Sequence, residues 1–404
     1  MFTKFEGPLH YRDFRLFIIG HFLSFTGSWV QTTALHWIIY GLNKSSSELG
    51  LYSFITTFPS IFATLIAGFL IDRFPRKKLL QTLLTLALFP PLFLFLLVHH
   101  HLYNFWVLAF IGLFSSLLAS MDMPLRQVFI SELVPTRYLT QALSLQAFSF
   151  NSARMLGPII AGLIMSYYSL SLCFFINFLS FLPLLLFTYF INPRFIMPKS
   201  RVNRKLNEEF LNLINFLRKR GEILLILTIV ATFTFFATSV IILLPMLTLE
   251  ILKGNAKEFA FLSSGVGIGA ILGALTVFLK REPFHEINQL IKAHVLWFLG
   301  VLGLIFAKTF PICFISVMLI GMAFTNFYPV ANGLLQKMTV SEVRGKVMSL
   351  FSVAFLGMAP FGQLFVGLSA EKLPLPLLLT LLIVFFLPTN LYILLILRRK
   401  VIYA

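Results

Sequence analysis

The feature that most constrains the fold of this chain is a series of long apolar runs. An apolar helix of about 20 residues is long enough to cross the roughly 30 Å hydrocarbon core of a bilayer. With 58% hydrophobic and only 12% charged residues over 404 positions, the chain carries more apolar surface than a water-soluble fold can bury. The sequence therefore predicts an all-α integral membrane protein with twelve transmembrane helices, at residues 14–40, 48–71, 79–98, 104–126, 139–167, 170–191, 222–247, 258–279, 288–307, 310–335, 343–370 and 375–397.

The basic residues predict the orientation of these helices. The net charge is +17, and most Lys and Arg residues lie in alternate turns between the apolar runs. Such turns face the cytoplasm. We therefore expect a multi-pass protein of the plasma (inner) membrane with both termini cytoplasmic. Because the positive charge follows the turns, it does not indicate nucleic acid as a partner.

The chain divides into similar halves. We expect a six-helix bundle at residues 1–191, a cytoplasmic linker at 192–221 with an amphipathic surface helix, and a second six-helix bundle at 222–404. An ungapped shift of 205 residues places Gly68 on Gly273, Pro124 on Pro329 and Gly157 on Gly362. Two such repeats predict pseudo-symmetric bundles with a substrate site between them near the middle of the membrane.

A short basic turn with a specific pattern separates the second and third runs. The stretch Gly68 to Lys78 reads GFLIDRFPRKK, and it resembles the loop signature of the major facilitator superfamily. Gly68, Asp72, Arg73 and Arg76 match that signature, while Pro75 stands where glycine is usual. The resemblance implies a gating motif, in which Asp72 latches the cytoplasmic ends of the second and eleventh helices. We also expect Gly68 to let neighbouring helices approach closely.

Three further stretches, 14–37, 123–163 and 327–368, resemble the drug-proton antiporter-3 branch of that superfamily, which includes macrolide-efflux and enterobactin-exporter-like proteins. This implies a secondary active transporter that exports a small amphipathic compound of the drug or siderophore type by alternating access, as a proton-coupled multidrug antiporter would. Lysophospholipid transporters share part of the second stretch.

Polar residues in the first and fifth runs are candidates for substrate binding. Ser24, Ser28, Gln31, Thr32 and His36 recur every three or four residues and so form one polar stripe on a helix. In lipid such a stripe has to face protein or water. The third and twelfth runs carry almost no such stripe, which suits helices that face lipid.

Arg154 lies near the middle of the membrane, with Asn151 one turn earlier on the same face. A lone guanidinium at that depth is costly unless it is paired or hydrated. We take Ser28, Gln31, His36, Asn151 and Arg154 as substrate-binding candidates. Interhelical hydrogen bonding is the alternative role for each of them.

Coupling to protons has few candidate residues, because no Asp or Glu lies at mid-membrane. Asp13 and Asp122 lie near the predicted cytoplasmic helix ends, where water from inside could reach them. An unperturbed histidine titrates near neutral pH, so His21 and His36 are further candidates for proton binding. We take Asp13, His21 and Asp122 as coupling candidates, and uncoupled movement of the substrate remains an alternative.

Two other functions remain open at this point: a lysophospholipid or lipid flippase, and a non-transporting membrane receptor or scaffold. No nucleophile and base arrangement indicates an enzyme, and the sequence predicts neither a metal site nor a cofactor. The expected partners are a small amphipathic molecule, protons and membrane lipid. A monomer is sufficient for this mechanism.

Overall fold

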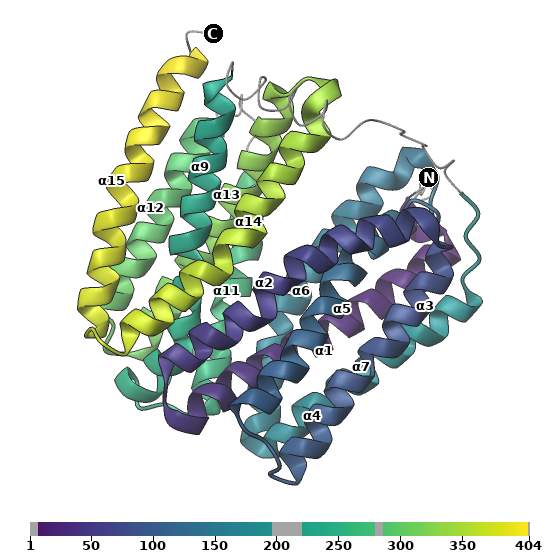
Figure 1. The fold of residues 1–404 in the computed structure, drawn as a ribbon, viewed down its shortest axis with the longest axis horizontal. Coiled ribbons are helices and arrows are strands. Elements are labelled where there is room, and N and C mark those ends of the chain that lie inside the picture. The colour runs from purple at the N-terminus through teal and green to yellow at the C-terminus, as the bar shows by residue number, and fades with distance from the viewer. Residues whose placement is uncertain (1–6, 196–219, 279–285, 403–404) are drawn as a thin grey trace, which may run out of the picture. The chain divides into compact units, whose positions relative to one another are not determined.

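The computed structural model describes residues 7–195, 220–278 and 286–402, and every regular element within them is helical (Figure 1). The predicted all-α fold is confirmed, and a helix lies in each of the twelve predicted ranges. The predicted amphipathic linker helix falls mainly on residues 196–219, outside the described residues.

The helices of the first half are η1 (Pro8–His10), α1 (Arg12–Asn43), α2 (Ser46–Arg73), α3 (Arg76–Ala87), α4 (Phe89–His99), α5 (Phe105–Ile130), α6 (Thr136–Tyr167) and α7 (Leu170–Phe190). Those of the second half are α9 (Gly221–Ala237), η2 (Ser239–Leu243), α10 (Leu244–Met246), η3 (Leu247–Ile251), α11 (Ala256–Phe278), α12 (Glu286–Ile305), α13 (Phe310–Met338), α14 (Ser341–Ala370) and α15 (Leu375–Ile402).

Eleven helical spans among the described residues are long and apolar enough to cross a membrane. The helix α1 is not among them, although it has 32 residues. It carries buried His21, Ser24 and Gln31, and such polar residues lower its mean hydropathy. Because polar groups in a bilayer need protein partners, this helix is expected to be surrounded by other helices.

Two of the predicted spans are interrupted. The third breaks at Leu88 between α3 and α4, directly before Pro90 and Pro91. The seventh ends as an α-helix at Ala237 and continues through 3-10, α and π turns to Ile251. Pro245 lies in this irregular stretch and has no N–H to donate to the carbonyl of residue 241, so a regular α-helix is not maintained there.

The chain forms two compact units. Unit 1 contains Met1–Lys44, Ile55–Ser200 and Asn255–Ser264, and unit 2 contains Ser45–Phe54, Arg201–Gly254 and Gly265–Ala404. The first turns of α2 therefore pack within unit 2, and those of α11 pack within unit 1. The predicted boundaries at 191 and 222 differ from this division at the starts of these two helices.

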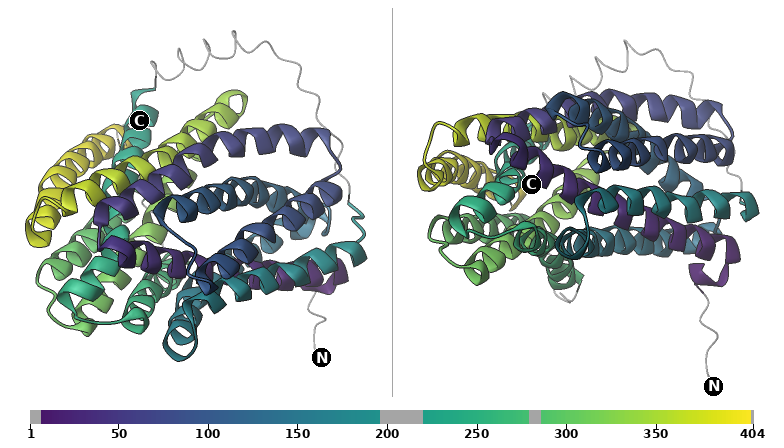
Figure 2. Two further views of the ribbon diagram at one scale, coloured as in Figure 1. Left: turned by 60° about the horizontal axis from the view of Figure 1, so that its bottom comes forward. Right: turned by 90° about the horizontal axis from the view of Figure 1, so that it is seen from below.

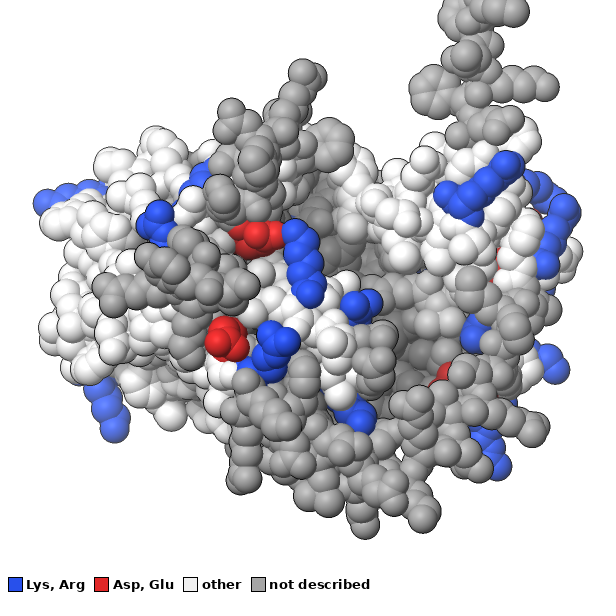
Figure 3. Space-filling view, turned by 90° about the horizontal axis from the view of Figure 1, so that it is seen from above, with Lys and Arg blue, Asp and Glu red and all other residues white. Residues whose placement is uncertain are grey.

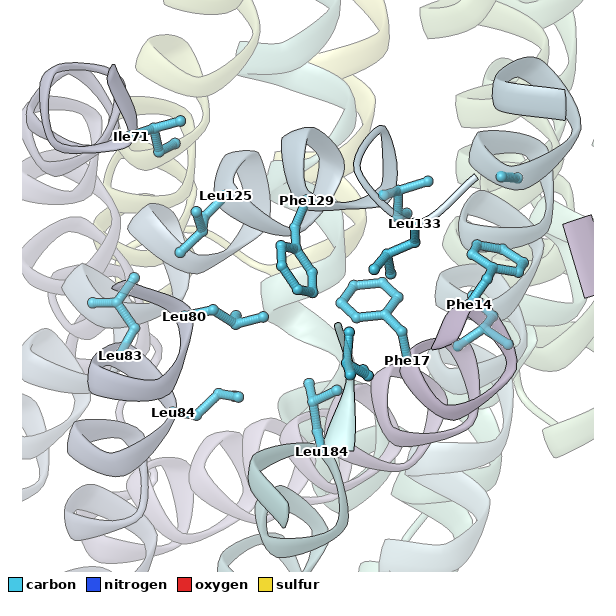
Figure 4. Packing of buried hydrophobic residues seen from close by; sticks show 14 of the residues in the cluster. Phe14, Phe17, Ile71, Leu80, Leu83, Leu84, Leu125, Phe129, Leu133 and Leu184 are labelled. Atoms are coloured by element: carbon cyan, nitrogen blue, oxygen red, sulfur yellow. The ribbon is translucent and has the colours of Figure 1, made fainter. Parts of the chain in front are cut away.

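The core of unit 1 is a layer of aromatic and leucine side chains where α1, α3, α5 and α7 meet (Figure 4). Phe14 and Phe17 of α1 are fully buried, as is Phe129 of α5. The rings of Phe17 and Phe129 have centroids 5.7 Å apart. This packing fixes α1 beside α5, which is the pair that carries the candidate site below.

Close contact between α1 and α7 depends on glycine (Figure 1; Figure 2). A Cβ atom at Gly27 would lie 2.0 Å from the Oγ of Ser180 and 2.7 Å from the Oδ1 of Asn177. No side chain fits there without displacing α7. The two helices can therefore approach closely enough for their polar side chains to hydrogen-bond directly.

The 205-residue repeat has a structural counterpart in two glycines. Gly157 of α6 packs against Trp29 of α1, and Gly362 of α14 packs against the carbonyl of Phe235 in α9. The two contacts join corresponding helices within their own units. The sequence repeat therefore reflects a repeated packing arrangement.

A carboxylate holds the start of α2 within unit 2. Glu371, directly after α14, accepts hydrogen bonds from the hydroxyls of Ser45 and Ser47 and from the backbone N–H of Ser47. The hydrogen bonds from Ser45 and Ser47 lower the pKa of this exposed carboxyl group. The negative charge also lies at the positive end of the α2 dipole.

Replacing Gly27 with alanine should destabilise the protein, because the added methyl group overlaps Ser180. We expect Gly27→Ala to lower the free energy of unfolding by about 1–3 kcal/mol, measured by thermal unfolding of the purified protein in detergent. Gly41→Ala on the same helix is the matched control, because a Cβ at Gly41 meets no atom within 4 Å. Equal unfolding temperatures for the two variants would contradict this packing.

Candidate functional site

A cluster of polar side chains in unit 1 surrounds Arg126, which lies in the last turns of α5. Its side chain is 1% exposed, and one guanidinium nitrogen lies 2.7 Å from the Oδ2 of Asp122, one turn earlier on the same helix. The Asp122 side chain is 13% exposed. A buried guanidinium needs such a partner, because an uncompensated charge in this environment is strongly destabilising.

Two side chains of α1 complete the environment of Arg126. Its Nη1 donates to the Oγ of Ser24 at 2.7 Å and lies 3.2 Å from the Nδ1 of His21. The guanidinium also lies 4.9 Å from the ring centroid of Phe25. Arginine can only donate, so Nδ1 of His21 acts as the acceptor and the imidazole is neutral in this arrangement. We refer to His21, Ser24, Asp122 and Arg126 as the Arg126 cluster.

The Arg126 cluster keeps unused hydrogen-bonding capacity. Among the described residues, the Nε2 of His21, the Oδ1 of Asp122 and the Nε of Arg126 are buried without a partner. Buried polar atoms are normally satisfied, so three unsatisfied atoms in one cluster mark a place where a proton, a water molecule or a polar ligand can bind. Of the three predicted coupling candidates, the structure brings together His21 and Asp122.

Asp13, the third coupling candidate, lies elsewhere. It belongs to the first turn of α1, and its Oδ2 accepts a hydrogen bond from the backbone N–H of Asn192 at 3.3 Å. This contact links the start of α1 to the residues that follow α7. Asp13 therefore has a structural role, in which its carboxylate joins these two segments of the chain.

Gln31 connects three helices. Its Oε1 accepts from the Nδ2 of Asn177 in α7 at 2.9 Å, and its Nε2 lies 3.4 Å from the Oγ of Ser115 in α5. Ser28 is half-buried and donates to the carbonyl of Ser24 within its own helix. His36 is also half-buried. Gln31 and Ser28 therefore already have protein partners.

Arg154 and Asn151 lie together on α6, facing α1. The Arg154 guanidinium carbon is 5.7 Å from the ring centroid of Trp29, within the range of a cation–π contact. Asn151 donates to the carbonyl of Ala147 in its own helix. Both side chains are half-buried. Arg154 thus combines a positive charge with an aromatic surface beside it.

The predicted gating motif makes contacts within unit 1. Arg76 forms an ion pair with Glu132 at 2.7 Å, and Lys77 donates to the carbonyl of Ile191 at 2.7 Å. Arg73 lies 5.8 Å from the ring of Phe69, and Asp72 is exposed. Basic side chains predominate over acidic ones on the face shown in Figure 3.

The close helix approach expected at Gly68 is not found within unit 1. A Cβ atom built at Gly68 would meet nothing within 4 Å, and the residue is exposed. Glycine is therefore not required there by packing within unit 1.

Sequence analysis did not select Arg126, Glu132 or Asn177 as site residues. Asp122 and Arg126 are four residues apart, which places their side chains together on a helix, and this spacing is a signal that the sequence does contain. Glu132 and Asn177 lie far along the chain from Arg76 and Gln31, their partners, so only the fold reveals those pairs.

Comparison with known proteins finds a family model and individual relatives that agree with one another. The model of the transmembrane secretion effector family matches residues 4–400. The staphyloferrin A transporter of Staphylococcus aureus (strain NCTC 8325 / PS 47) is 25% identical over 372 residues, or 88% of this chain and 89% of that protein. The uncharacterized MFS-type transporter YfiS of Bacillus subtilis (strain 168) is 26% identical over 158 residues, covering 38% of this chain and 36% of that one.

Solved structures share the fold at low sequence identity. The nucleoside transporter NupG superposes with a TM-score of 0.71 at 14% identity, over 96% of this chain and 98% of that one. A bacterial homologue of the iron transporter ferroportin gives 0.71 at 16% identity, over 96% and 98%. A D-xylose-proton symporter gives 0.67 at 14% identity, over 86% and 88%.

The ion pair of the Arg126 cluster should be measurable by a double-mutant cycle. Arg126→Gln leaves a buried carboxylate without its cation, and we expect it to lower the free energy of unfolding by about 3–5 kcal/mol. The Asp122→Asn, Arg126→Gln double variant should lose less than the sum of the single variants, by about 1 kcal/mol or more.

Thermal unfolding in detergent measures each variant of this cycle. Arg73→Gln, which removes an exposed positive charge, is the control and should leave stability nearly unchanged. Additive losses in the double variant would show that Asp122 and Arg126 do not interact.

Proposed function

This chain belongs to the transmembrane secretion effector family of major facilitator transporters, and we propose that it exports a small siderophore-type compound from the cytoplasm. The proposal includes a secondary active mechanism in the plasma (inner) membrane, with alternating access and a substrate site near the membrane midplane. Both termini then lie in the cytoplasm, as the distribution of basic residues predicts.

The choice of cargo rests on one observation. The staphyloferrin A transporter matches this chain over 88% of its length, and its name is that of a siderophore transporter. The family description as a secretion effector supports the outward direction. Drug-type cargo is the broader class that the sequence resemblance implies, so the tests below compare the two classes of compound.

We place proton coupling at the Arg126 cluster. Asp122 is the acid that ion-pairs with the buried guanidinium, and its Oδ1 has no partner among the described residues. A proton that binds this carboxylate neutralises it and removes the charge that compensates Arg126. The guanidinium then needs a new partner, and its bonds to Ser24 and His21 join α5 to α1.

Protonation of Asp122 therefore changes the contact between α1 and α5. His21 can accept a proton at Nδ1 only after Arg126 moves away, because Nδ1 is the acceptor in the present arrangement. The two proton sites are therefore linked through one guanidinium. This linkage offers a physical route from proton binding to a rearrangement of α1.

We assign Arg154 to the cargo. A siderophore must present oxygen ligands to iron, and deprotonated oxygen donors carry negative charge that a guanidinium can pair with bidentately. The indole ring of Trp29 beside Arg154 offers an apolar surface for the rest of the molecule. Asn151, one turn earlier on the same face, supplies a polar amide.

Proton coupling predicts cargo-dependent proton flux in liposomes that enclose a pH-sensitive dye. Wild-type protein should move protons when a carboxylate or catecholate siderophore is supplied under an imposed proton gradient. Asp122→Asn should abolish this flux, because an amide does not bind the proton. Asp13→Asn is the matched control and should retain it.

The same assay identifies the alternatives. Cargo movement without any proton flux would contradict antiport and favour an uncoupled facilitator. Loss of flux in Asp13→Asn with normal flux in Asp122→Asn would move the coupling site to the start of α1. A response to headgroup-labelled lysolipid, with none to siderophores or cationic drugs, would favour a lipid flippase.

The cargo assignment predicts that Arg154→Gln raises KM for an anionic siderophore by about tenfold or more, the effect of losing a charge-assisted pair of roughly 1.5–3 kcal/mol. A cationic drug tested in the same liposomes should lose little. Lys308→Gln, which removes an exposed positive charge in the loop between α12 and α13, should leave both KM values unchanged. Equal KM values for wild type and Arg154→Gln would exclude Arg154 from the binding site.

A further inference from the structure

An exposed face of α3, beside Tyr189 of α7, carries a polar groove that the transport proposal does not use. Its volume is about 470 Å³, and it is lined by Lys78, Gln81, Thr82, Thr85, Leu86 and Tyr189. All but Tyr189 belong to the outer face of α3. We refer to this as the α3–α7 groove.

Three exposed side chains of α3 form a polar stripe that the sequence analysis did not identify. The third span is expected to carry almost no such stripe and to face lipid, and Lys78, Thr82 and Thr85 are exposed in the structure. They recur at intervals of four and three residues, so they lie on one face of the helix. A polar stripe on a membrane-facing surface requires a polar partner.

Hydrogen bonds within α3 satisfy only part of this stripe. The hydroxyls of Thr82 and Thr85 donate to the carbonyls of Lys78 and Gln81. Among the described residues, neither the Lys78 ammonium nor the Gln81 amide has a hydrogen-bond or ion-pair partner. The neighbouring Lys77 differs, because it donates to the carbonyls of Tyr189 and Ile191. Lys77 holds α3 to α7, and Lys78 faces outward beside it.

The stripe begins at a depth in the bilayer that corresponds to the headgroup of a phospholipid. The helix α3 begins at Arg76, so Lys78 and Thr85 lie about 3 Å and about 14 Å along its axis from that residue. The headgroup region on each side of a bilayer is roughly 5–8 Å thick. With α3 starting at the membrane surface, Lys78 is level with a phosphate, and Thr85, about 11 Å deeper, lies among the first methylenes of the acyl chains.

Apolar side chains continue the same face of the helix toward the membrane centre. Leu86, Phe89 and Phe93 are exposed, and the rings of Phe89 and Phe93 stack with centroids 6.5 Å apart. On α7, Leu186 is exposed one turn before Tyr189. A positive and polar end followed by an apolar track is complementary to an anionic headgroup followed by an acyl chain.

We propose that the α3–α7 groove binds one anionic phospholipid, with its phosphate at Lys78 and Gln81 and an acyl chain along Leu86, Phe89 and Phe93. The basic residues of the Gly68–Lys78 stretch make the cytoplasmic leaflet the source of this lipid. Lys77 ties α3 to α7 at the groove, so the bound lipid lies beside the segment that carries Arg76.

Native mass spectrometry of the purified protein tests the site by titration with phosphatidylglycerol and, separately, with zwitterionic phosphatidylcholine of the same chains. We expect wild type to bind phosphatidylglycerol more tightly. Lys78→Gln should weaken its binding by about fivefold, the effect of one surface cation on an anionic lipid, and leave phosphatidylcholine unchanged. Lys372→Gln, which removes an exposed cation outside the groove, is the matched control.

A second variant tests the acyl-chain part independently. Phe93→Gln should weaken both lipids, because it places an amide in the apolar track. Equal phosphatidylglycerol affinity in wild type, Lys78→Gln and Phe93→Gln would overturn the proposal. Displacement of the lipid by glycerol phosphate at equal concentration would also overturn it, because a soluble headgroup alone would then account for the binding.

Discussion

A buried guanidinium places the strongest electrostatic requirement on unit 1. Arg126 lies among apolar helices, and its charge is compensated by Asp122 and shared with Ser24 and His21. These partners come from two helices, so the charge can be buried only if α1 and α5 stay in register. The aromatic layer around Phe17 and Phe129 lies one turn from the cluster along α1, and its packing holds the two helices in that register. Packing and electrostatics therefore depend on the same helix pair.

The helices could be predicted from the sequence because the lipid environment restricts which backbone conformations can cross it. Each apolar run has to satisfy its own backbone hydrogen bonds and reach across the membrane, which leaves a helix as the solution. The interruption before Pro245 is the expected exception, since proline removes a backbone donor. The polar stripe on the exposed face of α3 was not predicted, because Thr82 and Thr85 stand among leucines in the sequence.

The candidate site was only partly predictable. His21 and Asp122 were chosen from their chemistry, and the fold brings them to one guanidinium. Arg126 itself was not selected, because charge counting does not reveal which side chains turn inward. Gln31 shows the opposite case: the sequence places it in a polar stripe, but its partner Asn177 lies 146 positions away. Such pairs depend on how close α1 and α7 come at Gly27.

The hydrogen bonds of Glu371 at the start of α2 bear on how the protein is made. Ser47 is synthesised 324 residues before Glu371, which follows α14. The start of α2 is thus made long before its carboxylate partner exists. Until α14 has been synthesised, the hydroxyls of Ser45 and Ser47 lack this carboxylate acceptor. The native contacts at the start of α2 are therefore completed only after most of unit 2 has been made.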